Sequence, residues 1–98
     1  MRMINTIVTA INNREEISFT YSGLSRVAQP ATVGLSTKGN DVLRCYQTEG
    51  GHVTPGHEWD LCYVAEILDL KLTGSHFSDN PPGYKKGDRG MSSIYAEL

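Results

Sequence analysis

The first apolar side chains of the chain recur at the spacing of a helix. They stand at i, i+3, i+4 and i+7 and so share one stripe of a helical surface: Ile4, Ile7, Val8 and Ile11. Asn12 and Asn13 follow directly, and asparagine tolerates the left-handed backbone with which many helices end. The pattern therefore predicts an N-terminal helix over residues 1–13.

After this helix, apolar and polar residues alternate with period two, which is typical of strands with one buried face. Five segments of the chain are predicted to be strands, 16–21, 24–35, 42–47, 59–64 and 68–72, and the alternation is found in the first and the last two of them. A proline cannot donate to a strand ladder, so Pro30 predicts that the second segment lies at a sheet edge or bends there. The sequence Lys38-Gly39-Asn40 predicts a hairpin between the second and third segments.

Two stretches rich in glycine and proline lack any alternation. Residues 48–58 are predicted to form a loop, and its length for so small a domain makes it a candidate functional loop. Residues 78–90 are predicted to form an irregular arm. The last eight residues place apolar side chains at i, i+3, i+4 and i+7, which predicts a short C-terminal helix over 91–98.

A helix followed by five short strands with mostly tight turns is typical of a small antiparallel barrel. We therefore predict a mainly β fold, with the barrel over residues 16–74. Ninety-eight residues suffice for one domain, so 1–98 is taken as a single unit. An open five-stranded sheet capped by the first helix is the alternative, but five short strands bury little core as a flat sheet, which favours the barrel.

Composition narrows the class of protein. Hydrophobic residues make up 39% and charged residues 20% of the chain, which argues against disorder. The net charge of −2 argues against a general nucleic-acid coating protein. No apolar run is long enough for a membrane span or a secretory signal, so we expect a cytoplasmic protein without a membrane partner. Cys45 and Cys62 are then expected to be reduced thiols in the core rather than a disulfide.

Two arginines on neighbouring predicted strands, Arg26 and Arg44, are the leading candidates for ligand contacts. If they share a face, their guanidinium groups can bind phosphate or carboxylate oxygens bidentately. Aromatic side chains near them can stack a base: Tyr21, Tyr46 and Trp59. The alternative is that each arginine is a surface residue paired with Glu16 or Asp41.

The most basic stretch lies in the predicted arm, where Tyr84, Lys85 and Lys86 are further candidate ligand contacts. The conservative interpretation is that the arm packs on its own barrel, held by Phe77 and Tyr84. Crossing to a second subunit and closing over an anionic ligand are the alternatives. A strand interrupted by proline leaves open sheet edges, which favours a homo-oligomer.

No metal, cofactor or catalytic motif stands out. His52 and His57 lack the number and spacing of zinc ligands, although contact with a phosphate remains an alternative for them. Residues 34–39 contain glycine and lysine without the Walker spacing, so a hairpin is predicted there. Without a nucleophile elbow or paired catalytic carboxylates, we predict that the protein is not an enzyme and uses no metal or cofactor.

Several short motifs, collinear over nearly the whole chain, together resemble the WYL domain. The first is Ala10-Ile11-x-x-Arg14-x-x-Ile17-x-Phe19-x-Tyr21-x-Gly23-x-x-Arg26-x-x-x-Pro30. The others are Gly39-x-x-x-Leu43-Arg44-x-Tyr46-Gln47, Trp59-x-Leu61, Ile67, Phe77, Tyr84 and Asp88. The resemblance implies a five-stranded SH3-like or Sm-like barrel after a helix. It also implies a ligand-sensing module like those of bacterial and phage regulators, several of which bind nucleic acid or nucleotides.

The chain also departs from the family pattern. The eponymous Trp-Tyr-Leu run is replaced by residues 42–46, which read Val-Leu-Arg-Cys-Tyr. Tyr63 and Glu66 stand where basic side chains are expected, so two phosphate contacts of the family differ here. No helix-turn-helix domain accompanies the motifs, and the resemblance is therefore to a stand-alone version of the domain.

These observations predict a binding domain that senses or sequesters a nucleotide-like or other anionic ligand, of a bacterial or phage regulatory or anti-defence type. The predicted ligand contacts are Arg26, Arg44, Tyr46, Trp59, Tyr84, Lys85 and Lys86. One alternative is a protein-interaction module that regulates a transcription or defence complex without a small ligand. Another is single-stranded nucleic-acid binding.

Overall fold

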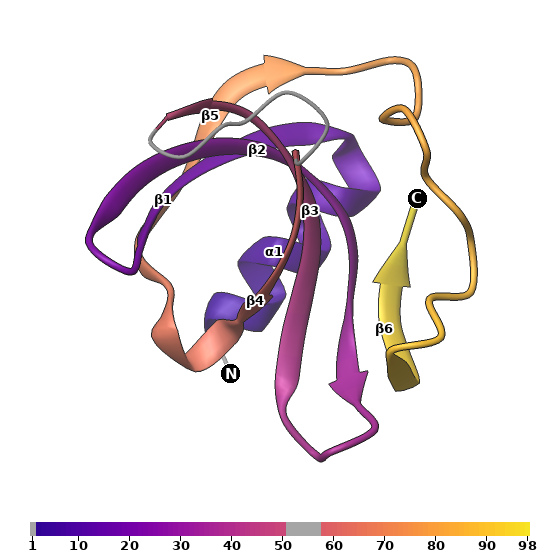
Figure 1. Ribbon diagram of the computed structural model, residues 1–98. Coiled ribbons are helices and arrows are strands. Elements are labelled where there is room, and N and C mark those ends of the chain that lie inside the picture. Colours follow the sequence, from indigo (N-terminus) through magenta and orange to yellow (C-terminus); the bar gives the residue numbers. More distant parts are fainter. Residues whose placement is uncertain (1, 51–57) are drawn as a thin grey trace.

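The computed structural model describes residues 2–50 and 58–98. Within them the chain forms an N-terminal helix and six strands (Figure 1). In chain order the elements are α1 (Arg2–Asn13), β1 (Glu15–Tyr21), β2 (Leu24–Ser36), β3 (Asp41–Gly50), β4 (Trp59–Tyr63), the short 3-10 helix η1 (Val64–Glu66), β5 (Leu68–His76) and β6 (Met91–Glu97). The predicted N-terminal helix and mainly β fold are confirmed.

The strands form one antiparallel sheet in the order β4-β3-β2-β1-β5, with β6 as a further partner of β2. Strand β2 is the centre of this sheet. It pairs with β3 along one edge, while its other edge is shared by two strands. Residues 24–28 of β2 pair with β1, and residues 32–36 pair with β6.

Pro30 lies in the gap between these two pairings of β2. The register against β3 shifts between Pro30 and Thr32, which marks an irregularity in the strand there. The missing N–H of proline therefore falls where β1 has ended and β6 has not yet begun. The predicted interruption at Pro30 is confirmed, but the edge position is wrong, because β2 is the central strand.

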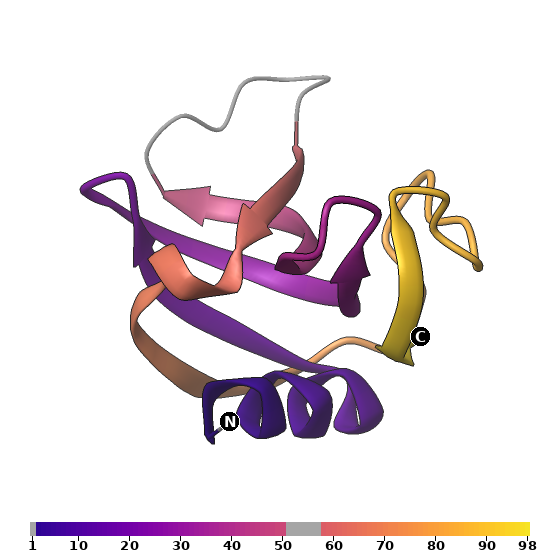
Figure 2. The same ribbon diagram turned by 90° about the horizontal axis from the view of Figure 1, so that it is seen from below.

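The hydrophobic core lies between α1 and the curved sheet, as Figure 2 shows. Helix α1 contributes Ile7, Ala10 and Ile11, which are nearly inaccessible to solvent. They pack with inward-facing residues of the sheet such as Ile17 and Leu43. The helix is amphipathic for this reason, since its polar side is exposed while the apolar stripe covers the sheet.

The predicted C-terminal helix is wrong, because residues 91–97 form strand β6. Met91 is buried, whereas Ile94 and Tyr95 are 36% and 43% exposed, so the apolar stripe of the expected helix does not exist. Eight residues are too few for a stable isolated helix, while the β2 backbone beyond Pro30 offers donors and acceptors that need partners. Strand β6 satisfies them, which gives six strands in the described part of the chain rather than five.

The predicted barrel is not confirmed. Strands β4 and β5 end the pairing order, and no pairing joins them within residues 2–50 and 58–98. The sheet nevertheless curves enough that the Tyr63 backbone N–H, at the end of β4, donates to the Tyr21 hydroxyl of β1 over 3.0 Å. The alternative of an open sheet capped by the helix describes the arrangement, apart from the strand number. No helix in the described residues is long and hydrophobic enough to span a bilayer.

Candidate functional site

The pairing of β3 with β4 places three of the predicted ligand contacts on one face of the sheet. Tyr46 pairs with Trp59 and Arg44 pairs with Leu61. Side chains alternate between faces along a strand, so these residues lie opposite the buried Cys45. The rings of Tyr46 and Trp59 meet edge to face, with centroids 5.4 Å apart. This contact holds the indole at the sheet surface.

The arm over residues 78–90 runs along the side of the molecule beside β6 before the chain enters that strand (Figure 1), and it contacts this face through Trp59 and Arg44. Hydrogen bonds anchor it at several points: Arg14 Nη2 donates to Asn80 Oδ1 (2.7 Å), Trp59 Nε1 to the Pro82 carbonyl oxygen (2.8 Å), the Tyr84 hydroxyl to the Leu98 carbonyl oxygen (2.9 Å) and the Gly87 amide to Glu97 Oε2 (3.1 Å). The arm therefore packs on its own sheet, as predicted. Of its two predicted anchors, Tyr84 makes the bond above, and Phe77 lies under the Arg14 guanidinium at 5.8 Å.

An ion pair joins the arm to the centre of the sheet. Arg44 Nε donates to Asp88 Oδ2 over 2.8 Å, and Nη2 donates to Oδ1 over 3.2 Å. The Gly90 amide also donates to Asp88 Oδ1 over 2.8 Å. These donors lower the pKa of Asp88 below its ordinary value, with Arg44 the main cause. The carboxylate is largely buried, whereas the Arg44 side chain remains 33% exposed.

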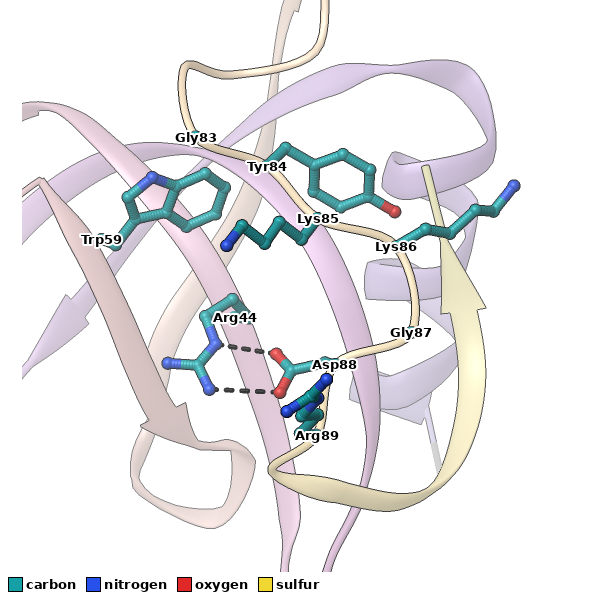
Figure 3. Close-up of a pocket in the computed structure, with 9 residues that line it drawn as sticks. All are labelled: Arg44, Trp59, Gly83, Tyr84, Lys85, Lys86, Gly87, Asp88 and Arg89. Atoms are coloured by element: carbon teal, nitrogen blue, oxygen red, sulfur yellow. Dashed lines mark hydrogen bonds and ion pairs between the residues drawn. The ribbon is translucent and has the colours of Figure 1, made fainter.

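Between the arm and the sheet lies an open-sided cavity of about 560 Å³. Its described lining consists of Arg44, Trp59, Gly83, Tyr84, Lys85, Lys86, Gly87, Asp88 and Arg89. The volume is typical of small-molecule sites. Four cationic side chains and a single carboxylate are thus part of this lining. In Figure 3 the Lys85 side chain extends from the arm toward Trp59 and Arg44, whereas Lys86 points the other way.

Most of the predicted ligand contacts meet at this cavity. Arg44, Trp59, Tyr84, Lys85 and Lys86 line it, and Tyr46 supports it through Trp59. Burial raises the pKa of Tyr84, which keeps its hydroxyl protonated as the donor to the chain end. Two residues that the sequence analysis did not select, Asp88 and Arg89, complete the charged lining. Asp88 is one of the residues that carry the resemblance to the WYL domain, and Arg89 lies in the basic stretch of the arm. The sequence therefore held a signal for each of them.

Arg26 does not line this cavity, and the expectation that it shares a face with Arg44 is wrong. It pairs with Phe19, whose side chain is in the core, so Arg26 projects from the inner face. Its guanidinium contacts Asp60 at 3.4 Å and lies 5.3 Å from the Tyr21 ring centroid. The register shift at Pro30 puts the two arginines on opposite faces.

The alternative that both arginines are paired surface residues is correct only in part. Each is paired with a carboxylate, but the partners are Asp60 and Asp88 rather than Glu16 and Asp41. The Arg26 side chain is only 11% exposed, and its Nε is buried without a hydrogen-bond partner. This arginine therefore stands at the rim of the core rather than on the surface.

Cys45 and Cys62 are buried, free thiols, as predicted. Cys45 pairs with Asp60 and Cys62 with Leu43, so the two cysteines are diagonal neighbours. Diagonal pairs have Cα atoms about 7–8 Å apart, beyond the range of an unstrained disulfide. A hydrogen bond to Cys62, together with burial, raises the pKa of Cys45.

The predicted loop at 48–58 begins later than expected, because β3 continues to Gly50. His52 and His57 lie outside the described residues. Within residues 2–50 and 58–98, no group of three or more histidine, cysteine, aspartate or glutamate side chains is arranged to hold a metal ion.

Comparisons with known proteins give no relative whose site could be compared with this one. The sequence matches no protein-family model, and neither curated proteins nor solved structures give a significant match. The chemistry of the site is therefore argued from its own residues.

Proposed function

We propose that the chain is a non-enzymatic binding domain whose cavity holds a nucleotide-like or other anionic ligand. The observation that carries the proposal is that Lys85 and Arg89 of the arm line one cavity together with Arg44 and Trp59 of the sheet. Cationic side chains bind phosphate oxygens, and an indole face stacks on a base. Because the chain as a whole has a net charge of −2, this concentration of cations is local.

Each lining residue has a role in this proposal. Arg44 presents a planar fork of donors to an anionic group, and the two lysines add charge from the arm. Trp59 offers a surface for an aromatic group, and Tyr46 fixes its orientation. A domain of this type senses or sequesters its ligand, in the cytoplasm and as part of bacterial or phage regulation.

Trp59 makes the proposal directly testable, because it is the only tryptophan in the chain and lines the cavity. We expect cyclic or linear di- and oligonucleotides to change its intrinsic fluorescence in a saturable manner, with isothermal titration calorimetry giving the same dissociation constant. Flat titrations with every nucleotide, on protein shown to be folded by circular dichroism, would refute the proposal.

A pair of variants separates the cavity from general charge effects. The variant Lys85→Gln should weaken binding about tenfold, because one charged contact in the cavity is lost. The matched control Lys71→Gln removes an exposed lysine on β5, outside this cavity, and should leave affinity unchanged. Equal weakening by both changes would point to nonspecific attraction.

The same titrations distinguish the alternative functions. Single-stranded nucleic-acid binding predicts an affinity that falls steeply with salt concentration. A protein-interaction module predicts no nucleotide response and a stoichiometric protein partner in a pull-down from lysate.

We also propose kinship with WYL domains, with an SH3-like or Sm-like barrel as the underlying fold. The strongly curved antiparallel sheet and the preceding helix support this proposal. So does the presence of Arg44, Trp59 and Asp88, all part of the family motif, at one cavity. Tyr63 and Glu66, which replace expected basic residues, lie outside this cavity, so the departure does not remove a cation from it.

Self-association is a further part of the proposal. Strands β4 and β5 are the two ends of the pairing order, so the β4 edge of one copy can pair with the β5 edge of another. Both strands carry large apolar side chains exposed to solvent: Leu61 and Tyr63 on β4, and Leu68 and Leu72 on β5. A second copy of the chain would cover them and extend the sheet.

A further inference from the structure

Asp88 is the one carboxylate among the described residues that line the cavity, and it occupies the fork of Arg44. We propose that Asp88 holds the place of a phosphate monoester: the ligand's phosphate binds Arg44 bidentately and displaces the Asp88 carboxylate, while the arm and its cations stay at the cavity. The inference rests on the proposed function, because it takes the cavity to be a ligand site.

The geometry of the pair carries the first step. Two nitrogens of Arg44 each meet a different oxygen of Asp88, at 2.8 and 3.2 Å. A phosphate group presents a pair of oxygens to the same planar fork, which is why arginine binds both groups bidentately. The Arg44 side chain is 33% exposed, so an incoming group can reach it from the cavity.

The charges around the pair identify the ligand class. Lys85, Lys86 and Arg89 line the cavity, and Asp88 supplies only one negative charge in return. A phosphate monoester near neutral pH carries up to two negative charges, so exchanging it for Asp88 improves the charge balance of the cavity. A carboxylate ligand would replace one carboxylate by another and gain nothing. The exchange therefore selects a phosphate monoester, either free or on a nucleotide.

The arm is attached in a way that lets the Asp88 carboxylate move while the arm stays in place. The Tyr84 hydroxyl bond to Leu98 and strand β6 secure the chain on either side of residues 85–90. Within that segment, the Gly87 amide donates to Glu97 and the Gly90 carbonyl oxygen accepts from the Thr37 amide, and neither bond involves the Asp88 side chain. Gly87 has a φ of +73°, a conformation that glycine enters and leaves without the strain that other residues incur. The sheet does not need to open for Asp88 to leave.

The test compares Asp88→Asn with the wild-type chain, using Trp59 fluorescence and three probes: 5′-AMP, adenosine and inorganic phosphate. Removing the internal competitor should tighten 5′-AMP binding about tenfold and leave adenosine unchanged. Inorganic phosphate should show the same tightening if the phosphate alone is recognised, and 5′-AMP alone should show it if the base is required too. The matched control Asp69→Asn removes the same charge from an exposed position on β5 and should have no effect.

The failures of the two proposals are distinguishable. If wild-type protein binds 5′-AMP and Asp88→Asn binds it equally or more weakly, Asp88 is a structural partner of Arg44, and only the inference is overturned. If neither protein binds any nucleotide or phosphate, the proposed function fails, and the inference fails with it.

A second measurement needs no variant. Saturating 5′-AMP should speed hydrogen exchange at the Gly90 amide, measured by NMR on the wild-type chain, because displacement of the Asp88 carboxylate breaks its bond to this amide. The Gly87 amide, which donates to Glu97, should keep its rate because the arm stays in place. Adenosine should leave both rates unchanged. Unchanged or slower exchange at Gly90 with 5′-AMP would mean that Asp88 keeps its contacts, and it would overturn the inference.

Discussion

Arg44 and Asp88 are separated by 44 positions in the chain, and their bidentate ion pair joins strand β3 to the arm. Arg44 holds the pKa of Asp88 below its ordinary value. A carboxyl whose pKa is lower in the folded than in the unfolded protein stabilises the fold above the unfolded pKa. That contribution is lost as the pH falls through the folded pKa, because protonation removes the charge that Arg44 binds.

This linkage predicts how the free energy of unfolding depends on pH. At neutral pH the wild-type chain should be more stable than Asp88→Asn by roughly 1–2 kcal/mol. The difference should persist down to about pH 4, near the unfolded pKa of aspartate, and vanish at lower pH. Urea denaturation across this range measures it. A difference independent of pH would show that the pair is not the source of the stability.

At the scale of elements, the central strand β2 determines where the others lie. Its edge opposite β3 is divided at Pro30 between β1 and β6. Gly34 then lets β6 approach closely, because a Cβ at this position would overlap the Ser93 carbonyl oxygen. Strand β6 also directs the arm, since it begins at Met91, which pairs with Ser36 at the end of β2, and the arm contacts Trp59 and Arg44 before it enters this strand. The cavity exists because of this path.

Substitution of Gly34 tests the role of β6. Gly34→Ala should destabilise the fold by about 1–3 kcal/mol, because the backbone of β6 must shift to admit the methyl group. Gly74→Ala is the comparison: its Cβ would meet open space, so only its φ of +86° is penalised, by about 1 kcal/mol. Thermal or urea denaturation gives both values. A smaller effect at Gly34 than at Gly74 would contradict close packing of β6.

At the scale of the whole molecule, the open sheet leaves the edges of β4 and β5 without a strand partner among residues 2–50 and 58–98. Leu68 on β5 is 61% exposed, an unusual position for a large apolar side chain on a strand at a sheet edge. Such an edge is a template for pairing with another chain. Trp59 of β4 also lines the cavity, so the proposed assembly edge at β4 and the proposed ligand site share this strand.

Native mass spectrometry tests the assembly. The wild-type chain should give the mass of a homo-oligomer, and Leu68→Lys should shift it toward the monomer by placing a charge at the interface. Ile94→Lys introduces the same charge at an exposed apolar residue of β6 and should not change the mass. A monomeric wild-type chain, or equal effects of both variants, would contradict pairing through β4 and β5.

Much of the fold was predictable because its signals are local. The helical stripe of α1 and the alternation in β1, β4 and β5 depend only on neighbouring residues. Of the separately predicted ligand contacts, Arg44, Trp59 and the two lysines line one cavity. The prediction for the C-terminal segment failed because the spacing of its apolar residues suits a helix, while its strand partner, β2, is distant in sequence. The prediction that Arg26 shares a face with Arg44 failed because register shifts near Pro30 move side chains of β2 to the other face of the sheet. Residue spacing alone does not reveal these shifts.

The sequence by itself therefore determined the helix, the β-rich class and the residue types available for an anionic ligand, since each follows from local periodicity and side-chain chemistry. Only the tertiary structure decided which residues meet. Contacts between distant segments determine that β6 pairs with β2, that Arg26 and Arg44 lie on opposite faces, and that Arg44 forms an ion pair with Asp88. Such contacts are selected by the packing of the whole chain, because many partners are compatible with the same local pattern.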